Sequence, residues 1–367
     1  MSFYEYYLEN KDIDFEYLFR NVDESEIISI LNKDNIDKYD FIKLLSPSAE
    51  KYLELIAQKA YKLSLQYFGK AVLLYTPIYI ANQCVNKCAY CSYNIDNKIS
   101  RKKLTLEEID IEAKKISYTG LKHILLLTGE SKKDIPISYI LDAVKVLKKY
   151  FDSVTLEVFP LTQEEYKQAV EAGVDGVTVY QEVYDEEIYD RVHIAGPKKN
   201  YRFRLDTPER ACKENIRTVN IGALLGLNDW RKEAFMTGIH CRYLQNKYPS
   251  VEYSISLPRI RPHVGSFNGI VEVNDKNLVQ IMLALRIFLP QVGITMSTRE
   301  KKEFKDKLIP LGVTKISAGV STEVGGHSLT DKGDSQFEII DNRNVDETRR
   351  DILALGYQPI FKNWMSI

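Results

Sequence analysis

The sequence predicts an α/β protein built as a (β/α)8 TIM-type barrel, with a helical N-terminal extension and a short C-terminal extension. Two observations lead to this prediction: eight short apolar runs follow residue 70, and each is followed by an amphipathic, helix-like stretch. A chain of 367 residues is long enough for one such barrel with extensions. We place the helical extension at 1–70, the barrel at 71–330 and the C-terminal extension at 331–367, packed on the barrel.

The predicted strands are runs of aliphatic and β-branched residues between turn and helix signals. They lie at 76–82, 122–128, 153–159, 176–181, 218–223, 252–257, 292–297 and 314–320. Thr105 with Glu108 and Thr162 with Glu165 have the spacing of helix capping boxes, and Pro208 suits a first helical turn. A doubly wound open sheet is the alternative fold. In both folds the chemistry belongs at the carboxyl ends of the strands.

Residues 1–70 are expected to be helical because apolar residues recur there at helical spacing. One such stretch includes Ile27 and Ile30, and a second runs from Tyr52 to Leu63. Ser46-Pro47-Ser48 directly precedes the second stretch, where a helix-start signal belongs. We therefore expect the first strand to be reached through a helical extension.

The composition excludes several classes of protein. Lys and Arg number 50 against 51 Asp and Glu, so the chain lacks the basic excess that is typical of nucleic-acid-binding proteins. The longest apolar runs, at 71–75 and 124–127, are much shorter than the ~20 residues that span a bilayer. The acidic, aromatic N-terminus does not resemble a secretory signal. We expect a cytoplasmic protein without a membrane partner, in which thiols stay reduced.

Three of the five cysteines lie close together, directly after the first predicted barrel strand. Cys84, Cys88 and Cys91 have the spacing C-x₃-C-x₂-C. Three thiolates on one loop can hold three corners of a [4Fe–4S] cluster and leave one iron open for another ligand, as a catalytic site needs. Zinc completed by a distant histidine is the alternative. Cys212 and Cys241 lack such spacing and are expected to be buried thiols.

Polar residues also occur where other predicted strands end. Thr128-Gly129-Glu130 closes the second strand, where glycine allows close backbone approach and the carboxylate can accept a hydrogen bond from an ammonium group. Glu157 lies among apolar residues of the third strand, and its side chain faces either the barrel interior or a solvated edge. These residues are candidates for a ligand site at the mouth of the barrel.

The cysteine motif, with the aromatic Tyr90 before its last cysteine, resembles that of the radical S-adenosylmethionine superfamily. The resemblance implies a [4Fe–4S] cluster whose open iron binds S-adenosylmethionine, which is cleaved to a 5′-deoxyadenosyl radical. It also implies that the Thr128-Gly129-Glu130 segment holds the methionine amino group. The candidate residues for binding S-adenosylmethionine are Tyr90, Thr128, Gly129, Glu130, Glu157, Gln181, Glu182, Ile221 and Gly222. Of these, Gln181 and Glu182 are expected at the ribose, and Ile221-Gly222 at the adenine.

Several longer segments are similar to the aromatic amino-acid lyase branch, and within it to the 2-iminoacetate synthase family, the tyrosine lyases of thiamine biosynthesis. They are V-Y-Q-E-V-Y at 179–184, H-I-A-G-P-K-K-N-Y from His193, I-G-A-L-L-G-L-N-D-W-R at 221–231, L-P-R-I-R-P at 257–262, and the closing Q-F-E-I-I-D-N-R and G-Y-Q-P-I-F-K-N-W. The related tyrosine lyases of hydrogenase maturation carry a second cysteine motif. No cysteine follows Cys241, which favours the thiamine family.

A buried amino-acid carboxylate needs a cationic partner, and arginine can bind it through two parallel hydrogen bonds. Arg299 at the end of the seventh strand and Ser317 in the eighth are the expected pair, by analogy with a related lyase. Ser321 is the alternative serine, and Arg259, or Arg261 beside it, the alternative arginine. Thr322, Glu323 and His327 are weaker candidates at the mouth of the site, and His193 and His263 receive no role.

The resemblance implies that L-tyrosine is cleaved between Cα and Cβ to 2-iminoacetate (dehydroglycine) and p-cresol, with methionine and 5′-deoxyadenosine as further products. The expected partners are thiazole synthase and reduced flavodoxin or ferredoxin as electron donor. Alternatives are a lyase for another aromatic amino acid or another pathway such as hydrogenase maturation, a non-catalytic iron–sulfur carrier, and a zinc-stabilised hydrolase.

Overall fold

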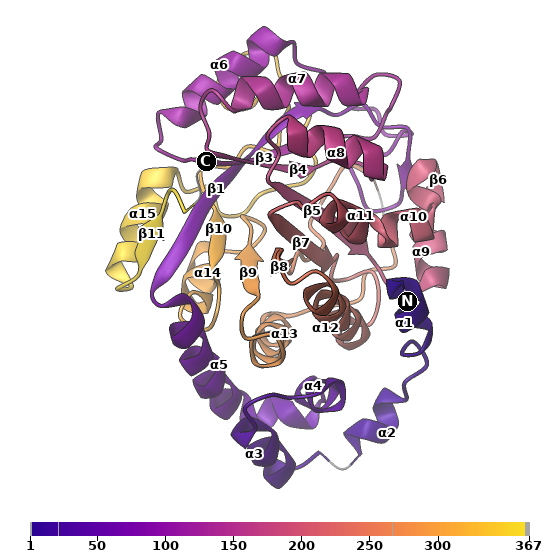
Figure 1. The fold of residues 1–367 in the computed structure, drawn as a ribbon, viewed down its shortest axis with the longest axis vertical. Helices are drawn as coiled ribbons and strands as arrows, with labels where there is room; N and C mark the ends of the chain where they lie inside the picture. Colours follow the sequence, from indigo (N-terminus) through magenta and orange to yellow (C-terminus); the bar gives the residue numbers. More distant parts are fainter. Residues whose placement is uncertain (1, 21, 266, 364–367) are drawn as a thin grey trace.

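The computed structural model describes residues 2–20, 22–265 and 267–363. Eight parallel strands form a closed barrel, because β10 pairs with β1 in register from Leu73↔Lys315 to Tyr75↔Ser317 (Figure 1). The strands are β1 (Ala71–Ala81), β3 (His123–Thr128), β4 (Ser153–Glu157), β5 (Gly176–Glu182), β7 (Thr218–Ala223), β8 (Glu252–Ser256), β9 (Gly293–Met296) and β10 (Lys315–Ser317). Each overlaps one of the eight predicted strands, so the predicted barrel is confirmed and the open sheet is excluded.

Helices surround the barrel and bury the outward-facing side chains of its strands. In β4, for example, Val154 and Leu156 are fully buried, whereas the alternating residues face the barrel interior. The surrounding helices are α6 (Leu106–Ser117), α7 (Ile137–Leu147), α8 (Gln163–Glu171), α9 (Glu186–Val192), α10 (Tyr201–Leu205), α11 (Thr207–Lys213), α12 (Trp230–Lys247), α13 (Asp275–Phe288) and α14 (Lys302–Leu308), with a 3-10 turn at Pro197–Lys199. The capping boxes at Thr105 and Thr162 and the first-turn Pro208 are present as predicted.

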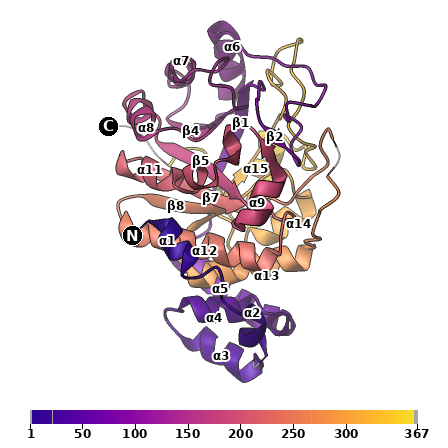
Figure 2. The ribbon, with the colours of Figure 1, turned by 90° about the vertical axis from the view of Figure 1, so that its right-hand side faces the viewer.

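The N-terminal extension is helical, as predicted, and packs on the outer helices of the barrel (Figures 1 and 2). Its elements are α1 (Phe3–Leu8), α2 (Phe15–Phe19), α3 (Glu24–Asn32), α4 (Lys38–Leu44), a 3-10 turn (Ser48–Tyr52) and α5 (Leu53–Phe68). Phe41 stacks on Phe288 of α13 with ring centroids 4.5 Å apart, and Phe3 stacks on His240 of α12 at 3.7 Å. This extension therefore covers α12 and α13, and its first helix also contacts α10 through the rings of Tyr4 and Tyr201.

Three short strands were not predicted. β11 (Gln358–Ile360) pairs with β1 outside the barrel and follows α15 (Val345–Ala354), whereas β2 (Lys87–Cys88) pairs with β6 (His193–Ala195) beside the cysteine loop. The last four residues of the predicted C-terminal extension, 364–367, lie outside the described residues. None of the helices in the described ranges is long and apolar enough to cross a membrane.

Candidate active site

The loop after β1 brings the three clustered cysteines to one cavity at the carboxyl ends of the strands. Cys84, Cys88 and Cys91 are free thiols that line this cavity of about 610 Å³, which we call the cysteine cavity. Its other lining residues include Asn86, Tyr93, Thr128, Gly129, Glu130, Glu157, Tyr180, Glu182, Lys198, Arg204 and Gln336. The predicted cysteine motif and the predicted Thr128-Gly129-Glu130 segment therefore lie at the same site.

Backbone contacts fix the shape of the cysteine loop. The guanidinium of Arg101 donates hydrogen bonds to the carbonyls of Asn82, Tyr93 and Asn94, at 2.7 to 3.0 Å. The amide of Ala89 donates to the carbonyl of Val192, next to the pairing of β2 with β6. The loop is thus held from both sides before any ligand binds.

Asn86 connects three parts of the site and was not predicted. Its Nδ2 donates to Glu130 Oε2 at 2.6 Å and lies 3.7 Å from Cys84 Sγ, while its Oδ1 accepts from the amide of Lys198 at 2.8 Å. Among the described residues, no donor reaches Glu130 Oε1 within hydrogen-bond distance, so one oxygen of this carboxylate is left for a ligand. The asparagine follows Cys84 by two residues, but its partners are distant in sequence and gave no local signal.

Tyr90 does not point freely into the cavity, because its hydroxyl is hydrogen-bonded to His193. The Tyr90 oxygen lies 2.7 Å from His193 Nε2, and His193 Nδ1 lies 2.9 Å from the carbonyl of Tyr189. Since a carbonyl only accepts, Nδ1 carries the proton and Nε2 accepts from Tyr90. Burial lowers the pKa of His193 to about 2, so the ring stays neutral. His193, which had no predicted role, therefore anchors the cysteine loop.

Gly129 lies where the backbone of the β3 end meets the cysteine loop. A Cβ atom at this position would lie 2.2 Å from the carbonyl oxygen of Gln83, a contact that the backbone cannot accommodate. The Gly129 amide also donates to the carbonyl of Ala81. Close approach of two backbones is thus the physical reason for a glycine at this strand end.

Glu182 forms a buried charge cluster with Lys198 and Arg204. Its Oε1 accepts from Lys198 Nζ at 2.7 Å and from Arg204 Nη2 at 3.3 Å. Although burial alone raises it, these two cations lower the pKa of Glu182 below its ordinary value. Glu182 also has a positive φ of 71°, at a bulge in β5. Such strain in a non-glycine residue is typical of functional sites.

The cysteine cavity fits the predicted cluster and its ligand. Burial raises the pKa of Cys88 to about 12 and that of Cys91 above its ordinary value, whereas the nearby Lys198 lowers both and so favours the thiolate form that binds iron. Thr128 Oγ1 is buried at the cavity and has no hydrogen-bond partner, as expected where a ligand supplies one. Within the described residues, no three His, Cys, Asp or Glu side chains are placed to hold a single metal ion.

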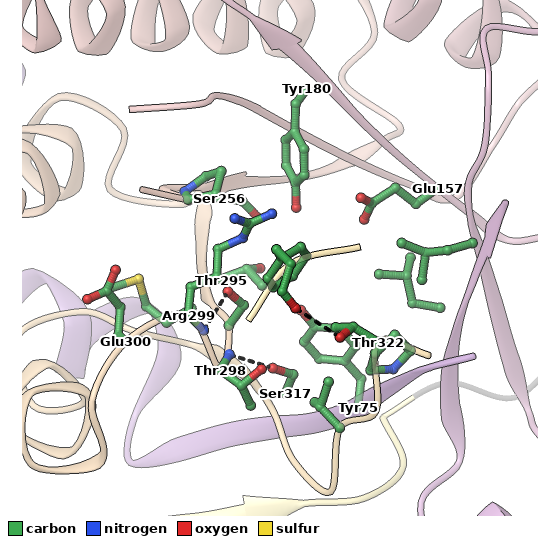
Figure 3. A pocket seen from close by; sticks show the side chains of 18 of the residues that line it. Tyr75, Glu157, Tyr180, Ser256, Thr295, Thr298, Arg299, Glu300, Ser317 and Thr322 are labelled. Carbon is green, nitrogen blue, oxygen red and sulfur yellow. Dashed lines mark hydrogen bonds between the residues drawn. The ribbon is translucent and has the colours of Figure 1, made fainter. Parts of the chain in front are cut away.

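A second cavity, of about 620 Å³, lies inside the barrel and adjoins the first. Glu157 and Tyr180 line both cavities. Figure 3 shows Glu157 and Tyr180 across from Tyr75 and Ser317. The side chain of Arg299 points into the same space, near Ser256 and Tyr180. We call this space the reaction cavity. Its further lining residues include Pro77, Tyr79, Leu125, Leu127, Ser256, Thr295, Thr298, Val320, Thr322 and Phe337.

Glu157 faces the barrel interior, the first of the two orientations considered from the sequence. Burial raises its pKa to about 7, although Arg299 acts in the opposite direction. Among the described residues, its carboxylate forms no hydrogen bond or ion pair. A carboxyl group that titrates near neutral pH is thus present at the junction of the two cavities.

The competing arginines differ in what surrounds them. Arg259 is paired with Glu300 and Asp275, and Arg261 donates to Glu300 at 3.0 Å. Arg299, in contrast, has no carboxylate partner in the described part of the chain. Its guanidinium lies 3.5 Å from the ring centroid of Phe337, and its Nη1 is 3.4 Å from the Arg259 carbonyl. The geometry favours Arg299 for a substrate carboxylate.

The two candidate serines lie in different places. Ser317 lines the reaction cavity and accepts a hydrogen bond from the amide of Thr298 at 3.1 Å. Ser321 is not among the residues that line this cavity, and its hydroxyl accepts from the amide of Glu323. Thr322 lines the cavity, as expected for the mouth of the site.

His327 and Glu323 do not line the reaction cavity, and both make structural contacts. His327 Nε2 lies 3.0 Å from the carbonyl of Pro77, to which it donates. The buried carboxylate of Glu112 accepts hydrogen bonds from the amides of His327 and Leu329. Glu323 pairs with Lys332 at 3.1 Å.

The remaining predicted ligands of S-adenosylmethionine lie near the site but do not line the two cavities. Gln181 is buried and its Nε2 has no partner. Ile221 is buried, and a Cβ at Gly222 would lie 2.4 Å from the Ser256 carbonyl oxygen and 3.2 Å from the Tyr180 ring. Their expected contacts with ribose and adenine stay predictions. The sequence also missed Gln336 and Phe337, which reach the site from the C-terminal segment.

Two family models match the chain. Residues 78–237 match the Radical SAM superfamily, and residues 256–358 match the Biotin and Thiamin Synthesis associated domain. The first match includes the cysteine loop and the ends of β3, β4, β5 and β7. The second includes the strands and loops that carry Arg299 and Ser317.

Solved structures with the same fold include the [FeFe]-hydrogenase maturase HydG from Carboxydothermus hydrogenoformans. It is 31% identical with a TM-score of 0.89, and the match covers 95% of this chain and 82% of that chain. Methylornithine synthase (PylB) superposes with a TM-score of 0.74 at 21% identity, covering 91% of this chain and 97% of that chain. The second likeness shows the fold alone.

Curated relatives match over nearly the whole sequence. The 2-iminoacetate synthase of Escherichia coli (strain K12) is 37% identical over 345 residues, which is 93% of this chain and 91% of the relative. That of Salmonella typhimurium is 38% identical over the same shares. The chain belongs to the 2-iminoacetate synthase family of radical S-adenosylmethionine enzymes.

Proposed function

We propose that the protein is a tyrosine lyase that cleaves the Cα–Cβ bond of L-tyrosine to 2-iminoacetate and p-cresol, with formation of 5′-deoxyadenosine and methionine. The product would supply the thiazole moiety of thiamine. The observation that carries this proposal, beyond family membership, is the junction of two cavities at Glu157 and Tyr180. One cavity holds the three thiols, and the other holds a cation suited to an amino-acid carboxylate.

In this proposal, Cys84, Cys88 and Cys91 hold a [4Fe–4S] cluster with one open iron. When reduced, such a cluster supplies the electron that cleaves S-adenosylmethionine to methionine and a 5′-deoxyadenosyl radical. Glu130, positioned by Asn86, accepts hydrogen bonds from the methionine ammonium group. Glu182 and Thr128 offer oxygen atoms to the rest of the ligand.

Tyrosine would lie in the reaction cavity with its carboxylate on Arg299 and Ser317. The aromatic lining of this cavity, which includes Tyr75 and Phe337, suits a phenol ring. Holding the substrate next to the cysteine cavity brings the hydrogen to be abstracted close to the abstracting carbon and excludes water. An electron donor is required, and reduced flavodoxin or ferredoxin is the class proposed. Because 2-iminoacetate hydrolyses easily, we also propose a complex with thiazole synthase.

The test is an anaerobic assay of the cluster-loaded protein with S-adenosylmethionine, dithionite and L-tyrosine. We expect 5′-deoxyadenosine and p-cresol to rise together with tyrosine, and neither to do so with L-tryptophan. Formation of 5′-deoxyadenosine without p-cresol would identify a radical enzyme with another substrate, such as a different aromatic amino acid. Failure to cleave S-adenosylmethionine with a fully loaded cluster would favour an iron–sulfur carrier.

A further inference from the structure

A third cavity, of about 900 Å³, lies at the amino ends of the barrel strands, opposite the cysteines. We call it the lower cavity. Its lining residues include Phe68, Leu73, His123, Ser153, Thr155, Thr178, Arg217, Thr218, Asn220, Glu252, Ser254, Thr314, Lys315 and Asn363. The proposed tyrosine lyase reaction uses none of these residues.

The interior of the barrel is polar at this level. Inward positions of barrel strands are ordinarily filled with branched apolar residues that form a packed core. Here they are Thr155 in β4, Thr178 in β5, Asn220 in β7 and Ser254 in β8. Asn220 hydrogen-bonds with Ser254 at 3.1 Å and more weakly with Thr178 at 3.4 Å. Hydroxyl and amide groups in place of a packed core indicate that this space accommodates a polar occupant.

Lys315 contributes a cation that the rest of the protein does not neutralise directly. Within the described residues, its ammonium has no carboxylate within ion-pair distance and makes no hydrogen bond. Its contact is with the ring of Tyr75, whose centroid lies 4.7 Å from Nζ. Burial lowers the pKa of Lys315 to about 8. A partly buried ammonium group without an anionic partner is unfavourable, and a bound anion would reduce this cost.

The other charges near Lys315 are already engaged or screened. Arg217 lies 3.2 Å from Glu252 and 3.6 Å from Asp175. Asp175 also accepts from Ser153 at 2.7 Å, and the Glu252 side chain is 65% exposed to solvent. Burial lowers the pKa of His123 to about 3, so this ring adds no charge. The two cations, Lys315 and Arg217, are thus matched by two carboxylates, and this balance suits a monoanion at Lys315 better than a phosphate dianion.

Two hydroxyl groups are available to complete such a site. Thr155 Oγ1 and Thr218 Oγ1 make no hydrogen bonds to other described residues, and both side chains line the lower cavity. Gly176 separates them, and a Cβ there would lie 2.5 Å from Thr155 Oγ1 and 2.6 Å from Thr218 Oγ1. The glycine therefore leaves room for both hydroxyl groups, which can donate to or accept from a small polar molecule in the cavity.

We propose that the lower cavity is a binding site for a small monocarboxylate, with Lys315 as its cation and Thr155 and Thr218 as hydrogen-bonding partners. The link to catalysis rests on the proposed function, because 2-iminoacetate and its hydrolysis product glyoxylate are such monocarboxylates. The site itself is independent of the cluster and of Arg299.

Binding of glycolate to the cluster-free protein tests this proposal by isothermal titration calorimetry. Glycolate carries a carboxylate and an α-oxygen but no electrophilic carbon. The titrations use Arg299→Leu protein, in which the proposed carboxylate partner of the reaction cavity is removed. In this background we expect Lys315→Met to weaken glycolate binding at least tenfold and Thr155→Val several-fold, whereas the exposed-site control Lys307→Met leaves binding unchanged. Equal binding with and without Lys315→Met, or no binding in the Arg299→Leu background itself, would overturn the proposal. If Lys315→Met does not fold, Thr155→Val decides in the same way.

The carboxylate could come from solution or from the reaction. A single turnover with ¹³C-labelled tyrosine, followed by rapid desalting, distinguishes the two sources. Two-carbon label retained by the wild type and lost from Lys315→Met supports the site with the product as its ligand. Label lost from both, with glycolate binding intact, supports the site with a carboxylate from solution. Failure of tyrosine cleavage would leave the glycolate result unaffected, so the two proposals can fail separately.

Discussion

The two ends of the barrel interior have different chemistry, although the same strands build both. A step of two positions along a strand leads from one end of the interior to the other, from Thr178 to Tyr180 in β5 and from Lys315 to Ser317 in β10. Because side chains alternate along a strand, every second residue forms a new layer of the interior. Both ends carry hydroxyl groups, but the carboxyl end combines them with Arg299, which has no carboxylate partner among the described residues, whereas the amino end combines them with Asn220 and Lys315. The polarity and charge of the barrel interior thus change from one layer of side chains to the next.

The largest expected effect is loss of the cluster at the carboxyl end, with ligand binding at the amino end unchanged. Cys88→Ala leaves two thiolates, which cannot hold the cluster, so we expect bound iron and cleavage of S-adenosylmethionine to fall to background. Binding of glycolate at the amino end should be unchanged. Cys212→Ala, which removes a buried thiol elsewhere, is the control and should keep the cluster. Normal iron content in Cys88→Ala would contradict the assignment of the cluster to this loop.

Glu157 tests the burial of a titrating group at the carboxyl end. Its pKa is raised from 4.5 to about 7, so its contribution to stability is complete below about pH 4.5 and is lost as the pH rises through 7. Relative to Glu157→Gln, the cluster-free wild type should lose up to ~3 kcal/mol of unfolding free energy between pH 5 and 8. Urea titrations across this range measure the difference.

The raised pKa of Glu233, to about 7, is common to both proteins in that comparison and therefore cancels. A pH-independent difference between the wild type and Glu157→Gln would show that the carboxyl group is solvated. It would then not lie in the closed junction of the two cavities.

Arg299 tests which end receives the substrate carboxylate. Arg299→Leu removes a charge-assisted contact worth roughly 1.5–3 kcal/mol, so the KM for tyrosine should rise roughly 10- to 100-fold. The ratio of 5′-deoxyadenosine to p-cresol should rise as well, because cleavage and substrate positioning become uncoupled. Arg299→Lys should recover part of the affinity. An unchanged KM would move the carboxylate to another cation, with Arg259 the next to test.

Tyr90 gives the smallest expected effect. Tyr90→Phe removes one hydrogen bond, to His193, and should lower the free energy of unfolding by about 1 kcal/mol while the cluster still loads. Tyr118→Phe, at a side chain that is 75% exposed, is the matched control and should have no effect. Complete loss of the cluster in Tyr90→Phe would mean that the hydroxyl does more than anchor the loop.

The fold could be predicted from the sequence because its signals are local. Apolar runs such as 122–128 mark the strands, and Thr105 and Thr162 mark helix starts through contacts three residues away. The unpredicted strands β2, β6 and β11 have two or three residues each. Their pairing depends on partners far along the chain rather than on a periodic pattern.

The site was predictable to the extent that it follows a compact motif. The cysteines and Thr128-Gly129-Glu130 are contiguous in sequence and lie at one cavity. Asn86 and His193 were missed because their contacts with Glu130 and Tyr90 join residues 44 and 103 positions apart. The choice of Arg299 over Arg259 also needed the structure, since only the position of Glu300 shows which guanidinium is already paired.

The most direct test of the central claim follows the carbon atoms of the substrate. The cluster-loaded protein would be incubated anaerobically with S-adenosylmethionine, dithionite and L-tyrosine labelled with ¹³C at Cα, and the products resolved by NMR. We predict label in glyoxylate, formed by hydrolysis of 2-iminoacetate, and unlabelled p-cresol in equal amount. Label in a product that retains the phenol ring would contradict cleavage of the Cα–Cβ bond.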